Sequence, residues 1–292
     1  MSHPDDTDPK ALSRRHFAAL SLASGLAATS AAAGAVFGRV ADSDVTVPTP
    51  NGQCDAAFAH PSGAGNWPAV ILFTDIFGLR PTMREMARRL AGNGYCVLVP
   101  NPFYRNTRAP GISMQFDFQD PKDRAHLAEL RAPLTNEGVA SDAKAFMAWL
   151  DSQPQVHREA KAGVFGYCMG GPLTVMAAAG VPERIGAGAS FHGGGLVTAR
   201  PDSPHRLVPR LRARFYFAIA ANDDQRQPEA KTELAQAFAA AHLPMRFEVY
   251  PGTLHGWCVK DMPLQDGKPI YNEPAAERAW HELLVLYREA LV

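Results

Sequence analysis

The distribution of apolar residues along the chain constrains its fold more than any other feature. Short runs such as Ala69–Phe73 (AVILF) and Tyr95–Pro100 (YCVLVP) show no polar alternation, as expected for strands buried on both faces. Between such runs lie longer segments with apolar residues at helical spacing, such as the segment that starts at Pro81. This repeated strand–helix–strand order predicts an α/β fold with a mostly parallel central sheet and helices on both faces.

The same pattern continues to the end of the chain. Further strands are expected at Ala162–Gly166, Gly186–Phe191, Arg214–Ala220 and Arg246–Tyr250, and further helices within residues 137–153, 228–243 and 274–291. Residues 101–133 are rich in Pro, Asp and Arg, which predicts an insertion over one end of the sheet. Because no linker interrupts residues 41–292, we expect them to form one domain.

Charge and cysteine content limit the possible partners. Lys plus Arg is 29 and Asp plus Glu is 29, so the chain lacks the net basic charge that favours nucleic acid or an anionic membrane surface. The four cysteines are scattered and form no CxxC pair. This spacing is unlike that of a disulfide scaffold or a usual zinc site, so the sequence predicts neither.

Residues 1–40 differ in character from the rest. Arg14 and Arg15 precede Ala18–Gly38, a run without charged residues that ends in small side chains. A basic region followed by a mildly apolar run is typical of an export signal, and the paired arginines indicate the twin-arginine (Tat) machinery as a partner. We expect a periplasmic mature protein with no stable membrane span. The alternative, a retained anchor, is less favoured because the run is weakly apolar.

Three loops that follow predicted strands carry residues suited to nucleophilic catalysis. Gly166–Gly170 (GYCMG) has the glycine spacing of a tight turn that holds a nucleophile, here Cys168, between a strand and a helix. Asp223 follows the strand at 214–220, with Asp224 as the alternative acid, and His255 follows the next strand. The order nucleophile, acid, histidine is that of the α/β-hydrolases.

Another segment, His192–Gly195 (HGGG), is similar to an oxyanion-binding motif that normally precedes the nucleophile. Because it follows Cys168 in this chain, it is placed beside the site without an assigned role. The histidines at positions 126, 157 and 242 lie on helical stretches and are expected at the surface.

The sequence as a whole resembles the dienelactone hydrolases. The resemblance rests on five motifs and runs from about Gly52 to the C-terminus: TDIFGLR (74–80), VPNPFYR (99–105), GYCMGG (166–171), AAND (220–223) and LHGW (254–257). It implies an α/β-hydrolase fold, a Cys168–Asp223–His255 triad and no metal or organic cofactor. It also implies that a carboxylate holds the resting thiol; this chain has Asp75 there, one methylene shorter than the family's glutamate.

The predicted chemistry is hydrolysis of a lactone or a small carboxylic ester through a thioester on Cys168. His255 would remove the thiol proton, Asp223 would orient His255, and the N–H groups of Met169 and Ile76 would bind the oxyanion. A thioesterase or acyltransferase with the same triad is an alternative. A non-catalytic binding protein is a third possibility, although such a protein has no need for nucleophile, acid and base together.

The resemblance also bears on the substrate. The family grips a substrate carboxylate with two arginines, of which one matches Arg105. Val259 occupies the second position, and the neighbouring Lys260 offers only a point charge. We therefore expect neutral lactones or short esters to be preferred over an anionic lactone.

Overall fold

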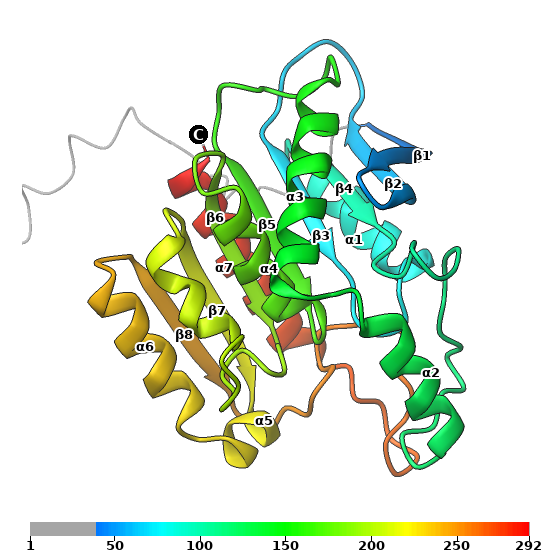
Figure 1. Ribbon diagram of the computed structural model, residues 1–292, viewed down its shortest axis with the longest axis vertical. Coiled ribbons are helices and arrows are strands. Elements are labelled where there is room, and N and C mark those ends of the chain that lie inside the picture. Colours follow the sequence, from blue (N-terminus) through cyan, green and yellow to red (C-terminus); the bar gives the residue numbers. More distant parts are fainter. Residues whose placement is uncertain (1–38, 292) are drawn as a thin grey trace, which may run out of the picture. The chain divides into compact units, whose positions relative to one another are not determined.

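One eight-stranded sheet organises residues 39–291, the part of the chain that the computed structural model describes (Figure 1). The spatial order is β1-β2-β4-β3-β5-β6-β7-β8. The strands are β1 (Val40–Thr49), β2 (Gly52–Pro61), β3 (Ala69–Phe73), β4 (Cys96–Pro100), β5 (Ala162–Tyr167), β6 (Ile185–Phe191), β7 (Arg214–Ala220) and β8 (Met245–Tyr250). Strand β2 is antiparallel to β1 and β4, whereas β3 to β8 pair in parallel.

Helices cover both faces of the sheet, as the sequence predicts (Figure 1). Helices α1 (Pro81–Ala91) and α7 (Glu273–Ala290) pack on one face. On the other face lie α3 (Asn136–Asp151), α4 (Gly170–Gly180) and α6 (Ala230–Ala240). The predicted α/β-hydrolase architecture, with its mostly parallel sheet between two helical layers, is thereby confirmed.

Helix α1 illustrates how local sequence sets the boundaries of an element. Pro81 occupies the first helical turn, where its missing N–H costs nothing, and Gly92 follows the last residue. Arg88 and Arg89 lie in the last turn, where cations complement the helix dipole. The predicted start at Pro81 is confirmed.

The antiparallel hairpin β1–β2 is the main part of the fold that the sequence analysis does not identify. Strand β1 (VADSDVTVPT) is polar and buries only Val47 fully, so it lacks the continuous apolar run that marks the central strands. It is held by a ten-residue register with β2, from Val40 opposite Pro61 to Thr49 opposite Gly52.

Charged side chains on the two outermost strands pair with neighbouring helices. Strand β1 pairs with α1, and β8 pairs with α7. The ion pairs are Arg84–Asp44, Arg88–Asp42, Arg246–Glu282 and Arg278–Glu248. Both edges of the sheet therefore carry charge within residues 39–291.

The predicted insertion contains α2 (Pro121–Arg131) and lies at the carboxyl end of the sheet. Its residues Phe103, Ile112 and Leu127 form an apolar cluster with Ile76 and Met169, and Cys168 packs against this cluster. The insertion thus forms one wall beside the loops that follow β3 and β5.

The predicted export signal at residues 1–40 lies almost entirely outside the described residues. Among the helices of residues 39–291, none combines the length and apolar character needed to cross a membrane. Residues 39–291 belong to one compact unit.

Candidate active site

The carboxyl ends of five neighbouring strands bring the predicted catalytic residues together. Because β3, β5, β6, β7 and β8 are adjacent and parallel, the loops that follow them emerge at one edge of the sheet. This edge is where open α/β sheets place ligands. Cys168 follows β5, and Asp223 and His255 follow β7 and β8.

Cys168 occupies the sharp turn that joins β5 to α4. Its φ of 51° lies in the left-handed region, which a residue with a side chain adopts only under strain. A side chain on Gly166 would clash with the carbonyl of Gly170, and one on Gly170 would clash with the carbonyl of Phe73. The glycine spacing of the motif is thus the steric condition for this turn.

Asp223 and His255 form the hydrogen bond that the sequence predicts. His255 Nδ1 lies 2.7 Å from Asp223 Oδ2, and both side chains are largely shielded from solvent. Asp223 lies in a short helix, α5 (Ala221–Arg226), which begins directly after β7. Asp224 instead binds Lys231 Nζ at 2.5 Å, so geometry distinguishes the two aspartates.

The thiol and the imidazole are close to each other. A ligand atom of Cys168, one of His255 and one of His192 all lie within 4.8 Å of one another. Burial lowers the pKa of His255, but its interactions with Asp223 and with the Cys168 thiol outweigh burial and raise the pKa to about 10. The site thus favours a protonated imidazole, the form that stabilises a neighbouring thiolate.

This shift predicts a pH-dependent contribution of His255 to stability. Because the pKa rises from the usual 6.5 to about 10 on folding, the stabilisation should be complete below about pH 6.5 and lost as pH rises through 10. Urea unfolding of the wild type and of His255→Gln at pH 6 and pH 10 measures it. The difference in the free energy of unfolding between the wild type and the variant should be much larger at pH 6 than at pH 10. A difference of equal size at both pH values would contradict the prediction.

The two predicted oxyanion donors lie on the loops that follow β5 and β3. Met169 follows Cys168, and Ile76 lies on the loop after β3; both belong to the apolar cluster of the insertion. Neither backbone N–H donates to another backbone group within residues 39–291. Two N–H groups in the expected loops therefore remain able to bind an oxyanion.

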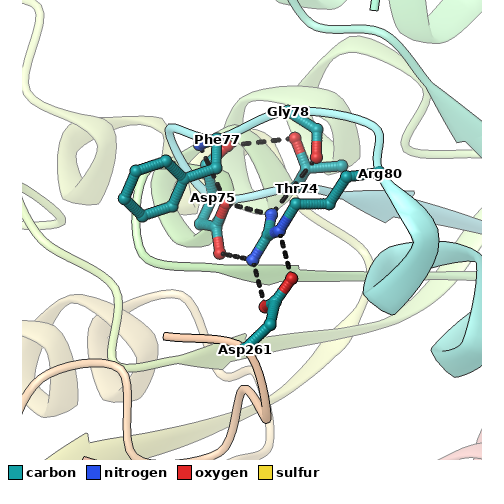
Figure 2. Close-up of polar contacts among 6 residues, drawn as sticks. All are labelled: Thr74, Asp75, Phe77, Gly78, Arg80 and Asp261. Atoms are coloured by element: carbon teal, nitrogen blue, oxygen red, sulfur yellow. Dashed lines mark hydrogen bonds and ion pairs between the residues drawn. The ribbon is translucent and has the colours of Figure 1, made fainter. Parts of the chain in front are cut away.

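Asp75 lies on the same loop but is bound to an arginine (Figure 2). Arg80 donates to Asp75 Oδ1 at 2.7 Å and to Oδ2 at 2.9 Å, and it also binds both oxygens of Asp261 at 2.8 Å. Asp75 Oδ1 accepts a further bond from the N–H of Phe77. Within residues 39–291, the expected hydrogen bond between Asp75 and the Cys168 thiol is not formed. Both Asp75 oxygens instead accept hydrogen bonds from Arg80.

This buried arrangement should dominate the local stability. Asp75 is 1% exposed and Arg80 6%, and burial raises the pKa of Asp75 while Arg80 opposes that shift. Arg80→Met would leave a buried carboxylate without its partner, which should lower the free energy of unfolding by about 3–5 kcal/mol.

Urea unfolding tests this, with Arg200→Met as the matched control. Arg200 binds Asp202 in a bidentate pair at the surface, with both side chains more than half exposed. The control should leave the free energy of unfolding unchanged, because exposed pairs contribute little. Equal losses in the two variants would show that the Arg80 interactions have no special weight.

Arg105, expected to bind a substrate carboxylate, is already paired. Its guanidinium donates to both oxygens of Asp142 at 2.7 and 2.8 Å and lies over the ring of Tyr104. Asp142 lies on α3 and is buried. Val259, at the second family position, is fully buried. Arg105 is thus already bound to a carboxylate, and Val259 carries no charge.

His192 lies beside Cys168 and His255, in the segment that the sequence analysis places next to the site without an assigned role. It directly follows β6, its ring lies 4.7 Å from that of His255, and it is 1% exposed. The available signal was the position of HGGG just after a buried strand. The sequence does not show that β6 pairs with β5, and this pairing brings His192 beside Cys168.

Comparison with known proteins places this chain in a family. The sequence profile of the dienelactone hydrolase family matches residues 54–291. The chain belongs to the dienelactone hydrolase family. The family match spans the sheet from β2 onward together with all the residues predicted for catalysis.

Individual relatives are distant but align over most of their length. A Synechocystis protein named "Putative carboxymethylenebutenolidase" is 28% identical over 85% of this chain and 96% of its own. A Pseudomonas putida carboxymethylenebutenolidase is 27% identical over 60% and 69%. The crystal structure of a Klebsiella pneumoniae protein named "Putative Dienelactone Hydrolase" has a TM-score of 0.73 at 22% identity, covering 86% of this chain and 99% of its own. These matches support a hydrolase of the dienelactone hydrolase class.

Proposed function

We propose that this protein hydrolyses lactones or small carboxylic esters through a thioester formed on Cys168. The observation that carries the proposal is the line of interactions from Asp223 through His255 to the Cys168 thiol, with the thiol held at a strained turn. The residues supply a nucleophile, a base and an orienting carboxylate, as nucleophilic acyl transfer requires.

The mechanism follows from these positions. His255 holds the proton taken from the thiol as an imidazolium, and the thiolate sulfur bonds to the substrate carbonyl carbon, whose oxygen becomes an oxyanion near the N–H groups of Met169 and Ile76. The carbon–oxygen bond to the leaving group then breaks, and His255 returns its proton to the departing alkoxide. Water, deprotonated by His255, attacks the thioester and releases the acid and the free thiol. Asp223 keeps the imidazole oriented and stabilises its charged form.

Rapid mixing with a p-nitrophenyl ester tests this proposal. We expect a burst of p-nitrophenol equal to one equivalent per site, followed by slower turnover, and mass spectrometry should find the acyl group on Cys168. Product analysis with added alcohols and thiols separates hydrolysis from acyl transfer. Complete absence of chromophore release would favour a binding protein and overturn the proposal.

The charges at the site favour neutral substrates. Arg105 is paired with Asp142, and Arg80 is paired with two carboxylates. A missing charge-assisted hydrogen bond costs about 1.5–3 kcal/mol, so an anionic lactone should lose about tenfold to a hundredfold in affinity. We expect a higher kcat/KM for a neutral lactone than for dienelactone under the same conditions. A tenfold preference for dienelactone would contradict this.

A further inference from the structure

His192, His255 and Cys168 form a cluster that the hydrolytic mechanism uses only in part. Each offers one ligand atom, and the three atoms lie within 4.8 Å of one another. They come from the loops after β6, β8 and β5, so no spacing along the chain could reveal the cluster. In the proposed mechanism Cys168 and His255 react, but His192 has no function.

His192 has the features of a metal ligand, because its ring nitrogens are buried and unpaired within residues 39–291. It is 1% exposed, yet neither of its ring nitrogens has a hydrogen-bond partner within residues 39–291. Its backbone φ of 40° is in the left-handed region. Its backbone N–H donates to the carbonyl of Ala218 at 2.8 Å. A buried polar group that is unsatisfied and strained is costly and marks a functional position.

We propose that Cys168, His192 and His255 form a binding site for a thiophilic divalent cation, Zn²⁺, and that occupation of this site blocks the nucleophile. One thiolate and two imidazoles are a donor set suited to tetrahedral zinc, with water or another small ligand in the fourth position. The inference rests on the position of the three side chains and does not require the hydrolytic proposal.

The geometry and charge around the cluster agree with this donor set. Bond lengths of about 2.0–2.3 Å to zinc place tetrahedral ligand atoms about 3.4–3.6 Å apart. Since no separation in the cluster exceeds 4.8 Å, each needs to close by at most about 1.4 Å. Cys168 is only partly buried and can turn its side chain toward the two rings. Because Asp223 binds Nδ1 of His255, Nε2 remains for the metal, which is the carboxylate–histidine–zinc arrangement seen around bound zinc.

Binding also balances in charge. Zn²⁺ displaces the one proton that the Cys168 thiol and Nε2 of His255 hold between them, and this proton leaves to the buffer. The thiolate and the Asp223 carboxylate then oppose the two positive charges of the ion. In this state the sulfur lone pair is bound to the metal and is no longer available for attack on a carbonyl.

The test is direct metal binding by the reduced, tag-free full-length chain. Zn²⁺ is titrated against a chelating dye, and Co²⁺ serves as a spectroscopic probe. We expect one strong site, a near-ultraviolet thiolate-to-cobalt charge-transfer band, and protection of Cys168 from iodoacetamide by Zn²⁺. His192→Asn should weaken Zn²⁺ binding tenfold or more, since even loss of an outer-shell partner costs about 10–100-fold. Cys168→Ala should remove the cobalt band.

The matched control is His126→Asn, which removes an exposed histidine on α2 and should bind Zn²⁺ as the wild type does. In the wild type itself, nitrogen resonances of labelled histidine should show two rings that shift together at one equivalent of Zn²⁺, whether or not the His192 variant folds. Zn²⁺ binding of unchanged strength in folded His192→Asn, or a wild-type chain without a thiolate–cobalt band, would overturn the inference. Ester hydrolysis is read separately in metal-free buffer, so failure of one proposal leaves the other open to its own test.

Discussion

Replacing Cys168 with alanine is expected to abolish ester hydrolysis while the fold remains intact. Removal of a nucleophile that works together with its base lowers kcat by on the order of 10⁶-fold in a comparable triad. Alanine has the same backbone preferences as cysteine at the φ of 51°, and its smaller side chain fits between Gly166 and Gly170. The strain of the turn is therefore unchanged and only the sulfur is lost.

The measurement is kcat for a p-nitrophenyl ester, accompanied by urea unfolding of the variant. Retention of more than about a tenth of wild-type kcat would exclude Cys168 as the nucleophile. Iodoacetamide labelling of the wild type gives an internal control from the other three thiols. Cys54, Cys96 and Cys258 are buried, and burial raises the pKa of each, to about 12 for Cys96. Cys168 should therefore be alkylated first.

The second large effect is expected at the acid. Asp223→Asn should lower kcat by about 10⁴-fold, because the amide cannot stabilise the imidazolium and permits the wrong tautomer of His255. The protein should still fold, since the substitution preserves the shape of the side chain and Asp223 lies in the short helix α5 outside the hydrophobic core.

Asp224→Asn is the matched control, since the two residues are adjacent and carry the same group. Asp224 binds Lys231 and does not contact His255. Its variant should keep kcat within a few-fold of the wild type. If Asp224→Asn is the more damaging of the two substitutions, the assignment of the acid is wrong.

Much of this fold could be predicted from the sequence because buried strands appear there as continuous apolar runs. Strands such as β3 and β4 are buried on both faces and therefore consist of uninterrupted apolar residues. Strand β1, which forms a hairpin with β2, has no such apolar run. It lies at the edge of the sheet, and its polar residues face solvent or arginines of α1. Edge strands depend on tertiary pairing, which a local pattern does not contain.

The site was predictable to the extent that its chemistry has a fixed chain order. The proximity of Cys168 and His255 could be predicted because glycines surround Cys168 in a tight turn and both residues follow parallel strands of one sheet. The Arg80–Asp261 ion pair joins residues that lie 181 positions apart in the sequence. No local sequence pattern in either segment predicts this pairing. Asp75 matched a family position by sequence, yet its partner is decided by where Arg80 points, which only the structure determines.

The charged pairs at β1 and β8 have a consequence for behaviour at high concentration. An open edge strand offers unpaired N–H and C=O groups to which a strand from another molecule can add. Here the approach to β1 requires desolvation of Asp42 and Asp44, and the approach to β8 requires the same of Arg246 and Glu248. Such charges act as gatekeepers against intermolecular β-sheet growth, so the exposed Phe247 of β8 need not seed aggregation.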